Sequence, residues 1–157
     1  MNRVGIGIDV HQFAPGRKCI IGGVDIPHDV GLLGHSDADV LAHAIADALL
    51  GAAALGDIGK YYPPEDMKFK NLDSMVIVRE CADRVRQAGA KISNVDAMII
   101  AQAPKMAPHI PKMQEILAKH MGIAPSQVGI KATTSEHMGF TGRKEGIVVV
   151  AIAALEM

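Results

Sequence analysis

The stretch that most constrains this fold is the run of small apolar residues from Val40 to Leu55, VLAHAIADALLGAAAL. Asp47 is the only formally charged residue in it, which is too few charges for a helix with a solvated face. Ser36 and Asp37 precede the run, and their short polar side chains can accept the free N–H groups of a first helical turn. We therefore expect a helix that begins there, is covered on most sides, and has the rest of the chain packed around it.

A narrow polar stripe interrupts this apolar helix. Asp39, His43 and Asp47 recur every four residues, so they lie on one side of a helix that turns by about 100° per residue. A histidine at the border of a core is either a hydrogen-bonded core residue or a metal ligand, and the helix alone favours the first interpretation. If His43 is a ligand, Asp39 and Asp47 are candidates to orient its ring, but their spacing on the helix does not favour that role over another one.

Length and charge narrow the class of protein. The 157 residues suit one domain with a continuous core, and we expect residues 1–157 to form that domain. Aromatic residues make up only 3% of the chain, so the core must rest on aliphatic side chains. The net charge is −1, with Lys and Arg dispersed, which leaves no electrostatic footprint for nucleic acid or an anionic membrane.

The cysteines and the apolar runs indicate a compartment. Cys19 and Cys81 are far apart and belong to no CxxC pair, which indicates reduced, buried thiols rather than a disulfide or a thiolate metal site. The first residues enter a strand pattern without the basic and apolar regions of a targeting leader. No apolar run is long enough to span a bilayer. We therefore expect a cytoplasmic protein that binds neither membrane nor nucleic acid.

The first predicted strand supplies two side chains that can bind metal. Residues 3–11 alternate β-branched residues with glycines and Asp9, which is strand periodicity. Asp9 and His11 therefore point to one face, and the preceding glycines let another backbone or a ligand approach it. If this strand lies beside the central helix, Asp9, His11 and His43 form a three-ligand site with an open position, as in catalytic zinc sites. The same ligands suit a facial-triad Fe(II) site, so they do not name the metal.

The remaining pattern predicts an α+β fold. We expect a hairpin at 19–26, strands at 97–101, 128–134 and 147–155, and two further helices at 74–87 and about 111–120. The last strand, IVVVAIAAL, shows no polar alternation, so both of its faces must be covered. Because the helices can cover only one face of a sheet, we infer that the other face packs against copies of the same chain.

A second group of polar residues follows the predicted strand at 128–134. Thr133, Thr134 and Ser135 supply hydroxyl donors, and Glu136 supplies a hard oxygen ligand, which suits Mg²⁺ bridging phosphate groups. A solvated strand end explains the same residues equally well.

Seven blocks of the sequence carry a family pattern. They are DVH at 9–11, HSDADV at 35–40, LLGAAALGDIGKYYPPED at 49–66, NVD at 94–96, AQAPKM at 101–106, KATTSE at 131–136 and GFTGRKEG at 139–146. Together they closely resemble the 2-C-methyl-D-erythritol 2,4-cyclodiphosphate synthases of the non-mevalonate isoprenoid pathway. The blocks occur in order over nearly the whole chain, and AQAPKM and FTGR-x-EG are too long for coincidence.

The resemblance implies both an activity and an assembly. The activity is a lyase reaction in which the 2-phosphate of 4-diphosphocytidyl-2-C-methyl-D-erythritol 2-phosphate attacks the β-phosphate of the same molecule. The products are 2-C-methyl-D-erythritol 2,4-cyclodiphosphate and CMP, and metal ions assist the attack. The implied fold is a mixed β-sheet with helices on one face. The implied assembly is a homotrimer in which the sheets pack around the axis, with active sites at subunit interfaces and an isoprenoid diphosphate in the central cavity.

The resemblance also assigns residues position by position. Asp9, His11 and His43 would hold zinc, Glu136 would hold Mg²⁺ or Mn²⁺ with the diphosphate, and His35 and Thr134 would be the catalytic donors to the reacting phosphorus. Residues 101–107 would form the cytosine pocket, while Phe140 and Arg143 would face the central channel. The full implied substrate-binding set is Asp9, His11, His35, Ser36, Asp57, Ile58, Gly59, Tyr62, Pro63, Pro64, Glu65, Asp66, Ala101, Gln102, Ala103, Pro104, Lys105, Met106, Ala107, Thr133, Thr134, Ser135, Glu136, Phe140 and Arg143.

The chain departs from the family pattern in two places. Ser135 stands where threonine is common, which keeps a hydroxyl, and Tyr61-Tyr62 stands where a bulky apolar pair is common.

Two other functions are alternatives to that of a cyclodiphosphate synthase. A non-haem Fe(II) oxygenase would use the Asp9, His11 and His43 triad, but it gives no reason for KATTSE or for the proline-rich segment after residue 101. A non-catalytic trimeric ligand-binding protein would account for the apolar last strand alone.

Overall fold

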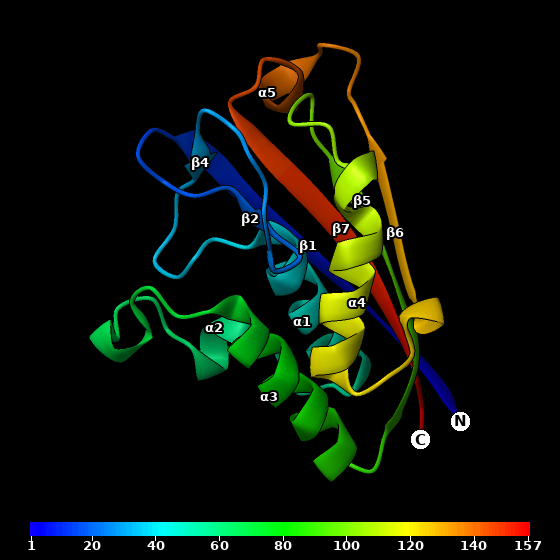
Figure 1. Cartoon of the computed structure of the whole chain (residues 1–157). Coiled ribbons are helices and arrows are strands. Elements are labelled where there is room, and N and C mark those ends of the chain that lie inside the picture. The colour runs from blue at the N-terminus through cyan, green and yellow to red at the C-terminus, as the bar shows by residue number, and fades with distance from the viewer.

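A five-stranded sheet is the largest element of the computed structural model, which describes residues 1–157. Its strands lie in the order β4-β1-β7-β5-β6. Their bounds are β1 Asn2–Ala14, β4 Gly31–Leu32, β5 Lys91–Ile100, β6 Val128–Thr133 and β7 Gly146–Glu156. β5 and β6 run parallel, whereas the other neighbours are antiparallel, so the sheet is mixed, as predicted (Figure 1).

The predicted hairpin is present beside this sheet. β2 (Ile20–Ile21) pairs with β3 (Val24–Asp25) in antiparallel register. Gly22 and Gly23 form the turn with φ angles of 60° and 77°, a conformation that glycine adopts without steric cost.

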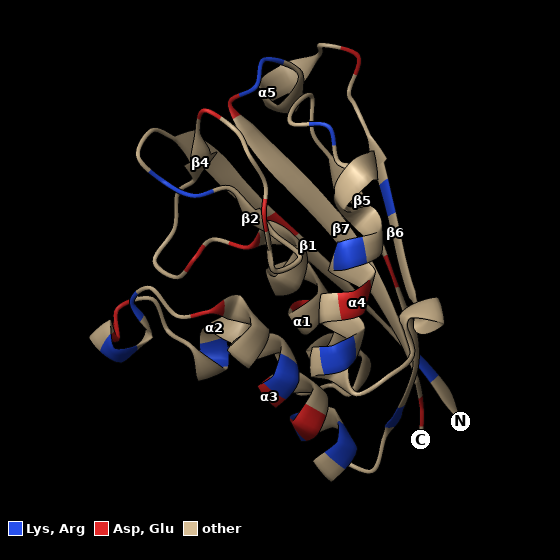
Figure 2. Cartoon of the chain, in the orientation of Figure 1, with Lys and Arg blue, Asp and Glu red and all other residues tan.

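Three helices cover one face of the sheet (Figure 1). They are α1 (Val40–Ala52), α3 (Ser74–Gln87) and α4 (Ile110–Met121). α1 packs directly on β1 and β7, and α3 packs against α1. In α1 only Asp47 and Gly51 are not buried, which confirms the prediction of a helix covered on most sides. Charged residues gather instead on α3 and α4 (Figure 2).

The helix ends follow local chemistry where the residues are free to act as caps. The Asp73 side chain accepts the N–H of Met75 and so caps α3, and Gly122 ends α4 with a left-handed backbone. None of the helices combines the length and the apolar character that a membrane span requires. Cys19 and Cys81 are buried free thiols, as predicted.

The starts of two elements lie well away from their predicted positions. α1 begins at Val40 with Asp39 as its N-cap, not with Ser36 or Asp37, because the Ser36 side chain contacts the His43 ring and the Asp37 side chain accepts from Ser74 on α3. β5 begins at Lys91, well before residue 97, since pairing with β7 extends it. The short elements had no sequence signal: α2 (Ile58–Tyr61), α5 (Gly139–Gly142) and the 3₁₀ turns η1 (Met67–Phe69), η2 (Ala107–His109) and η3 (Pro125–Gln127).

The face of the sheet opposite the helices is apolar and open in the single chain. The side chains of Val4, Ile6, Ile8 and Val10 on β1 are exposed, from 69% at Val4 to 50% at Val10. Ile152 on β7 extends this surface and is 46% exposed. On the helix-facing side of β7, by contrast, every second residue from 147 to 155 is buried. One face of the last strand is thus covered within the chain, and the other is apolar but uncovered.

Candidate functional site

Close contact between β1 and α1 creates the site. A Cβ atom at Gly7 would lie 1.9 Å from the carbonyl oxygen of Ala44, and one at Gly5 would lie 2.1 Å from that of Ala48. Only glycine at these positions lets the strand lie directly on the backbone of the helix. Asp9 and His11 follow on the same face of β1, so they meet His43 on α1.

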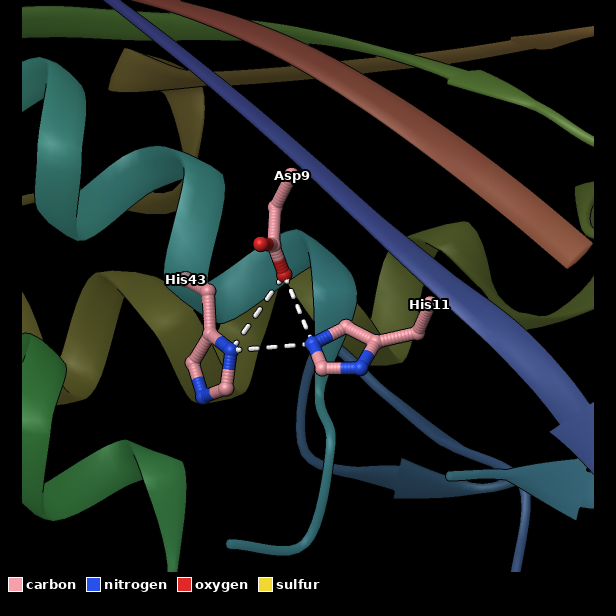
Figure 3. Close-up of side chains that lie close together, drawn as sticks. All are labelled: Asp9, His11 and His43. Carbon is pink, nitrogen blue, oxygen red and sulfur yellow. Dashed lines mark hydrogen bonds and ion pairs between the residues drawn. The ribbon is translucent and has the colours of Figure 1, made fainter. Parts of the chain in front are cut away.

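Asp9, His11 and His43 form a compact cluster (Figure 3). Asp9 Oδ2 lies 2.9 Å from His11 Nε2 and 3.3 Å from His43 Nδ1, and the two ring nitrogens are 3.4 Å apart. One ligand atom from each residue lies within 4.8 Å of the others. The predicted three-ligand arrangement is therefore present, with donors from one strand and one helix.

The backbone sets the orientation of the His11 ring. His11 Nδ1 lies 2.8 Å from the carbonyl oxygen of Leu33. A carbonyl only accepts, so Nδ1 carries the proton and donates it. The other ring nitrogen, Nε2, then presents its lone pair to Asp9 and His43 in the neutral ring.

The cluster fits a divalent metal ion. Asp9 Oδ2 is buried and has no hydrogen-bond partner, which is rare for a buried carboxylate oxygen. It is surrounded by two imidazole nitrogens, and a carboxylate with two imidazoles is a donor set that metals such as zinc accept. A cation at this point would satisfy all three groups.

In the absence of a cation, protons on the imidazole rings can supply the positive charge next to the Asp9 carboxylate. Burial lowers the pKa of His11, but the close contact with Asp9 and the attraction of its negative charge outweigh burial and raise that pKa above its ordinary value. Burial favours a raised pKa for Asp9, whereas His11 and His43 together bring that pKa below its ordinary value. The cluster is therefore polarised toward a negative carboxylate that faces positive charge.

Asp39 and Asp47 do not orient the His43 ring, because their carboxylates bond to backbone N–H groups. Asp39 accepts the N–H groups of Gly22, Gly23 and Ala42, and Asp47 accepts that of Ile58 at 2.8 Å. The side of the His43 ring away from the cluster contacts two hydroxyls instead. Nε2 lies 2.8 Å from Ser74 Oγ and 3.2 Å from Ser36 Oγ.

A cavity of about 270 Å³ opens beside the cluster. It is lined by the three clustered side chains, by six other residues of the predicted substrate-binding set and by three residues outside that set. The lining residues are Asp9, His11, His35, Ser36, His43, Ile58, Gly59, Tyr62, Pro64, Phe69, Leu72 and Ile77. The sequence prediction missed Phe69, Leu72 and Ile77, because their apolar side chains look like ordinary core residues.

Local bonds bring the distant parts of this cavity together. The Asp47 contact holds Ile58 and Gly59 against α1. The backbone of 35–37 pairs with that of 71–72, through Asn71 N to His35 O at 2.9 Å and Asp37 N to Leu72 O at 3.2 Å. His35 Nε2 lies 3.3 Å from the carbonyl oxygen of Asp66. These contacts place His35 at the wall formed by residues 62–72.

Tyr61 and Tyr62 anchor that wall to α3. The Tyr62 hydroxyl donates to Glu80 and accepts from Arg84 at 3.0 Å. The Arg84 guanidinium also lies 4.3 Å from the centre of the Tyr61 ring, a cation–π distance. The tyrosine pair thus combines packing against the apolar cluster of Ala46, Leu50, Ile77 and Cys81 with polar contacts to α3.

The rest of the predicted set lies elsewhere in the single chain. A second cavity is lined by Ala101, Gln102, Pro104, Lys105, Met106, Ala107, Ala132, Thr133 and Thr134. The Gln102 side chain accepts the N–H of His137 at 3.1 Å, which ties the AQAPKMA segment to the turn after β6. His35 and Thr134 therefore line different cavities of one chain.

Several predicted residues line neither cavity. Phe140 lines a third, with His11, Lys144 and Glu145 among its neighbours, and Arg143 pairs with Glu145 at 2.5 Å. Asp57 caps α2 and Asp66 caps η1. The remaining members, Pro63, Glu65, Ala103, Ser135 and Glu136, are not among the residues that line these cavities.

Proteins of known name share this sequence over nearly its full length. The 2-C-methyl-D-erythritol 2,4-cyclodiphosphate synthase of Cupriavidus necator is 60% identical over 153 residues, which is 98% of this chain and 90% of that protein. The protein of the same name from Moorella thermoacetica is 56% identical over 153 residues, covering 98% of this chain and 94% of that one.

Solved structures share the fold. The bifunctional IspDF of Campylobacter jejuni superposes with a TM-score of 0.95 at 44% identity, covering 99% of this chain, which spans 42% of that longer protein. A CDP complex of IspF from Plasmodium falciparum superposes with a TM-score of 0.86 at 30% identity, covering 98% of this chain and 95% of that one.

These similarities agree with the resemblance found in the seven sequence blocks. The family model described as YgbB matches residues 2–156. The chain belongs to the YgbB family.

Proposed function

We propose that this chain is a lyase that converts 4-diphosphocytidyl-2-C-methyl-D-erythritol 2-phosphate to 2-C-methyl-D-erythritol 2,4-cyclodiphosphate with release of CMP. The observation that carries the proposal is the Asp9, His11 and His43 cluster at the wall of a cavity. It occurs in a chain 60% identical to a synthase of that name. Residues 1–157 form one such domain.

The chemistry requires positioning more than a protein nucleophile. The attacking phosphate and the phosphorus under attack belong to one molecule, so holding the two ends together removes much of the entropic barrier. Asp9, His11 and His43 would hold zinc, and Glu136 would hold Mg²⁺ or Mn²⁺. When bound, these cations offset the repulsion between the phosphate groups.

The chain's own residues do the remaining work in this proposal. His35, Ser36, Ile58 and Gly59 bind the erythritol region at the first cavity. Residues 101–107 receive the cytosine at the second cavity, and Thr133 and Thr134 donate to phosphate. A well-placed donor to the charge that develops at the reacting phosphorus is worth about 10²–10³ in rate, and we assign that role to His35 and Thr134.

The two cavities combine in a homotrimer. His35 and Thr134 line separate cavities in one chain, so a complete site requires residues from neighbouring subunits. The open apolar face of β1 and β7 supplies the surface for such an assembly, since monomers rarely expose large contiguous apolar patches. In this arrangement Phe140 and Arg143 face the trimer axis, where an isoprenoid diphosphate would bind.

We place the reaction in the cytoplasm, where the buried free thiols of Cys19 and Cys81 would stay reduced. Neither rival function has comparable support. The relatives described above carry the name of a synthase and not of an oxygenase, and a pure ligand-binding module would not need an unsatisfied buried carboxylate oxygen.

The direct test is product analysis. The purified protein, given the cytidyl substrate with Zn²⁺ and Mg²⁺, is expected to release CMP and the cyclic diphosphate in equal amounts, as followed by phosphorus NMR. Hydrolysis of the substrate to an open-chain diphosphate, or no CMP at all, would contradict the proposal.

A further inference from the structure

The outer nitrogen of His43 is held by a buried hydroxyl. His43 Nε2 points away from the cluster with Asp9 and lies 2.8 Å from Ser74 Oγ. Ser74 is the first residue of α3 and is fully buried. The contact joins two helices 31 residues apart in the chain, so it has no sequence signal.

The Ser74 hydroxyl has a second partner, the carboxyl group of Asp37. Ser74 Oγ donates to Asp37 Oδ1. The same carboxyl group accepts the N–H of Ser74 at 3.0 Å and that of Asp39 at 3.1 Å. Asp37 is therefore the acceptor in every one of these contacts.

Counting protons fixes the direction of the chain of bonds. A hydroxyl has one proton, and the Ser74 hydroxyl uses it in the hydrogen bond that it donates to Asp37. The contact between Ser74 Oγ and His43 Nε2 must then be donated by the ring. His43 accordingly carries its proton on Nε2 and leaves the lone pair of Nδ1 free, on the side that faces Asp9 Oδ2 at 3.3 Å.

We propose that Asp37 and Ser74 are positioning residues that fix the metal-binding tautomer of His43. This inference rests on the proposed metal site. The carbonyl of Leu33 performs the same task for His11, so both imidazoles present bare nitrogens to Asp9. Outer partners of this kind orient metal-ligating histidines and keep them in the correct tautomer.

The nearby Ser36 hydroxyl shows why the direction of the hydrogen bond at His43 Nε2 matters for metal binding. This hydroxyl lies 3.2 Å from His43 Nε2 and accepts the N–H of Ala38, but no carboxylate takes its proton. Once Ser74 or Asp37 is removed, a free hydroxyl can donate to Nε2, and this would move the ring proton to Nδ1, where the metal should bind.

The test is a double-mutant cycle on metal affinity. The dissociation constant for Zn²⁺ is measured by competition with a chromophoric chelator for the wild type, Ser74→Ala, Asp37→Ala and the double variant. Each single change is expected to weaken zinc binding by about 10- to 100-fold. The double variant should be little worse than either single one, because both changes break the same chain of bonds.

Asp73→Ala is the matched control. Asp73 is the neighbouring N-cap of α3 and bonds to Met75, not to His43. Its replacement removes one helix cap and should leave zinc affinity unchanged. Thermal unfolding of all variants shows whether each one is folded.

The outcomes separate this inference from the proposed function. Unchanged zinc affinity in Ser74→Ala, additive losses in the double variant, or an equal loss in Asp73→Ala would overturn the positioning role. None of these results affects CMP release by the wild type. Conversely, a wild type that binds zinc in the expected pattern but releases no CMP would overturn the proposed reaction and leave the positioning role intact.

Discussion

Asp9 is the residue of the cluster whose carboxylate contacts both imidazole rings. Its Oδ2 atom is buried, unpartnered and within 3.3 Å of two imidazole nitrogens. The sequence indicated this donor set from the spacing of Asp9 and His11 on a strand. It did not indicate how the set is supported, because Gly22, Gly23 and Ile58 occupy the oxygens of Asp39 and Asp47 from distant segments.

Replacing Asp9 with asparagine should remove the metal site. An amide lacks the negative charge that balances the cation, so zinc affinity is expected to fall by more than about 100-fold, beyond the 10- to 100-fold typical of an outer partner. Chelator competition measures the change. Asp29→Asn, at a carboxylate 90% exposed, serves as the control and should bind zinc like the wild type.

Asp39 gives the folded chain a distinctive pH dependence. Burial raises the pKa of Asp39 to about 6, although the N–H of Ala42 opposes the shift. The folded state therefore holds a proton that the unfolded state releases near pH 4. Its contribution to stability is complete below about pH 4 and is lost as the pH rises to about 6.

Asp39→Asn should abolish that part of the pH profile. The comparison is urea unfolding of the metal-free wild type and variant between pH 4 and pH 7. The free energy of unfolding of the wild type, relative to the variant, is expected to decline from pH 4 to pH 6 and to be flat above. Parallel profiles for the two proteins would show that Asp39 keeps an ordinary pKa in the folded state.

Among the elements, the contact of β1 with α1 determines the geometry of the site. The glycine alternation in β1 signalled a close approach, and the structure identifies the backbone of α1 as what approaches. The limits of α3 were predictable from neighbouring residues, because Asp73 caps its start and Gly89, with a φ of 91°, follows its end. The start of α1 was not, since Ser36 and Asp37 serve His43 and Ser74 instead of the helix end.

Gly7→Ala tests this contact. The new Cβ would lie 1.9 Å from the carbonyl oxygen of Ala44, so strand and helix must separate, and we expect a loss of about 3 kcal/mol in the free energy of unfolding. Zinc affinity should fall as well, because Asp9 and His11 move away from His43.

Gly51→Ala is the control on the other partner, α1. The nearest atom to its Cβ would be the carbonyl oxygen of Ile6 at 3.7 Å, an ordinary contact. Alanine in a helix interior should stabilise the protein by about 0.5–1 kcal/mol. Urea unfolding gives the free energy of unfolding of Gly7→Ala and of Gly51→Ala. Equal values for the two variants would contradict the close packing of β1 on α1.

For the whole molecule, the open face of the sheet is the decisive feature. The uniform apolar character of the last strand predicted a second covered face, and the single chain leaves that face apolar and open on both β1 and β7. A single sequence reveals which surface needs a partner. The proposed joining of the cavities of His35 and Thr134 depends on how subunits are arranged, which no pattern within one sequence specifies.

Ile6→Lys should break the assembly. Ile6 is 62% exposed in the middle of the apolar face, and burying an unpaired ammonium group there is costly. Sedimentation velocity is expected to give trimers for the wild type and monomers for the variant. Met67→Lys, at a side chain 66% exposed outside the sheet, should remain trimeric, and a monomeric wild type would refute the proposed assembly.

The proposed reaction requires a cation held by Asp9, His11 and His43. The most direct measurement follows CMP release as bound zinc is removed by a chelator and then restored, with Mg²⁺ present throughout. Activity should disappear as zinc leaves and return in proportion to zinc rebound, up to one ion per chain. Full CMP release from the zinc-free protein would contradict the account.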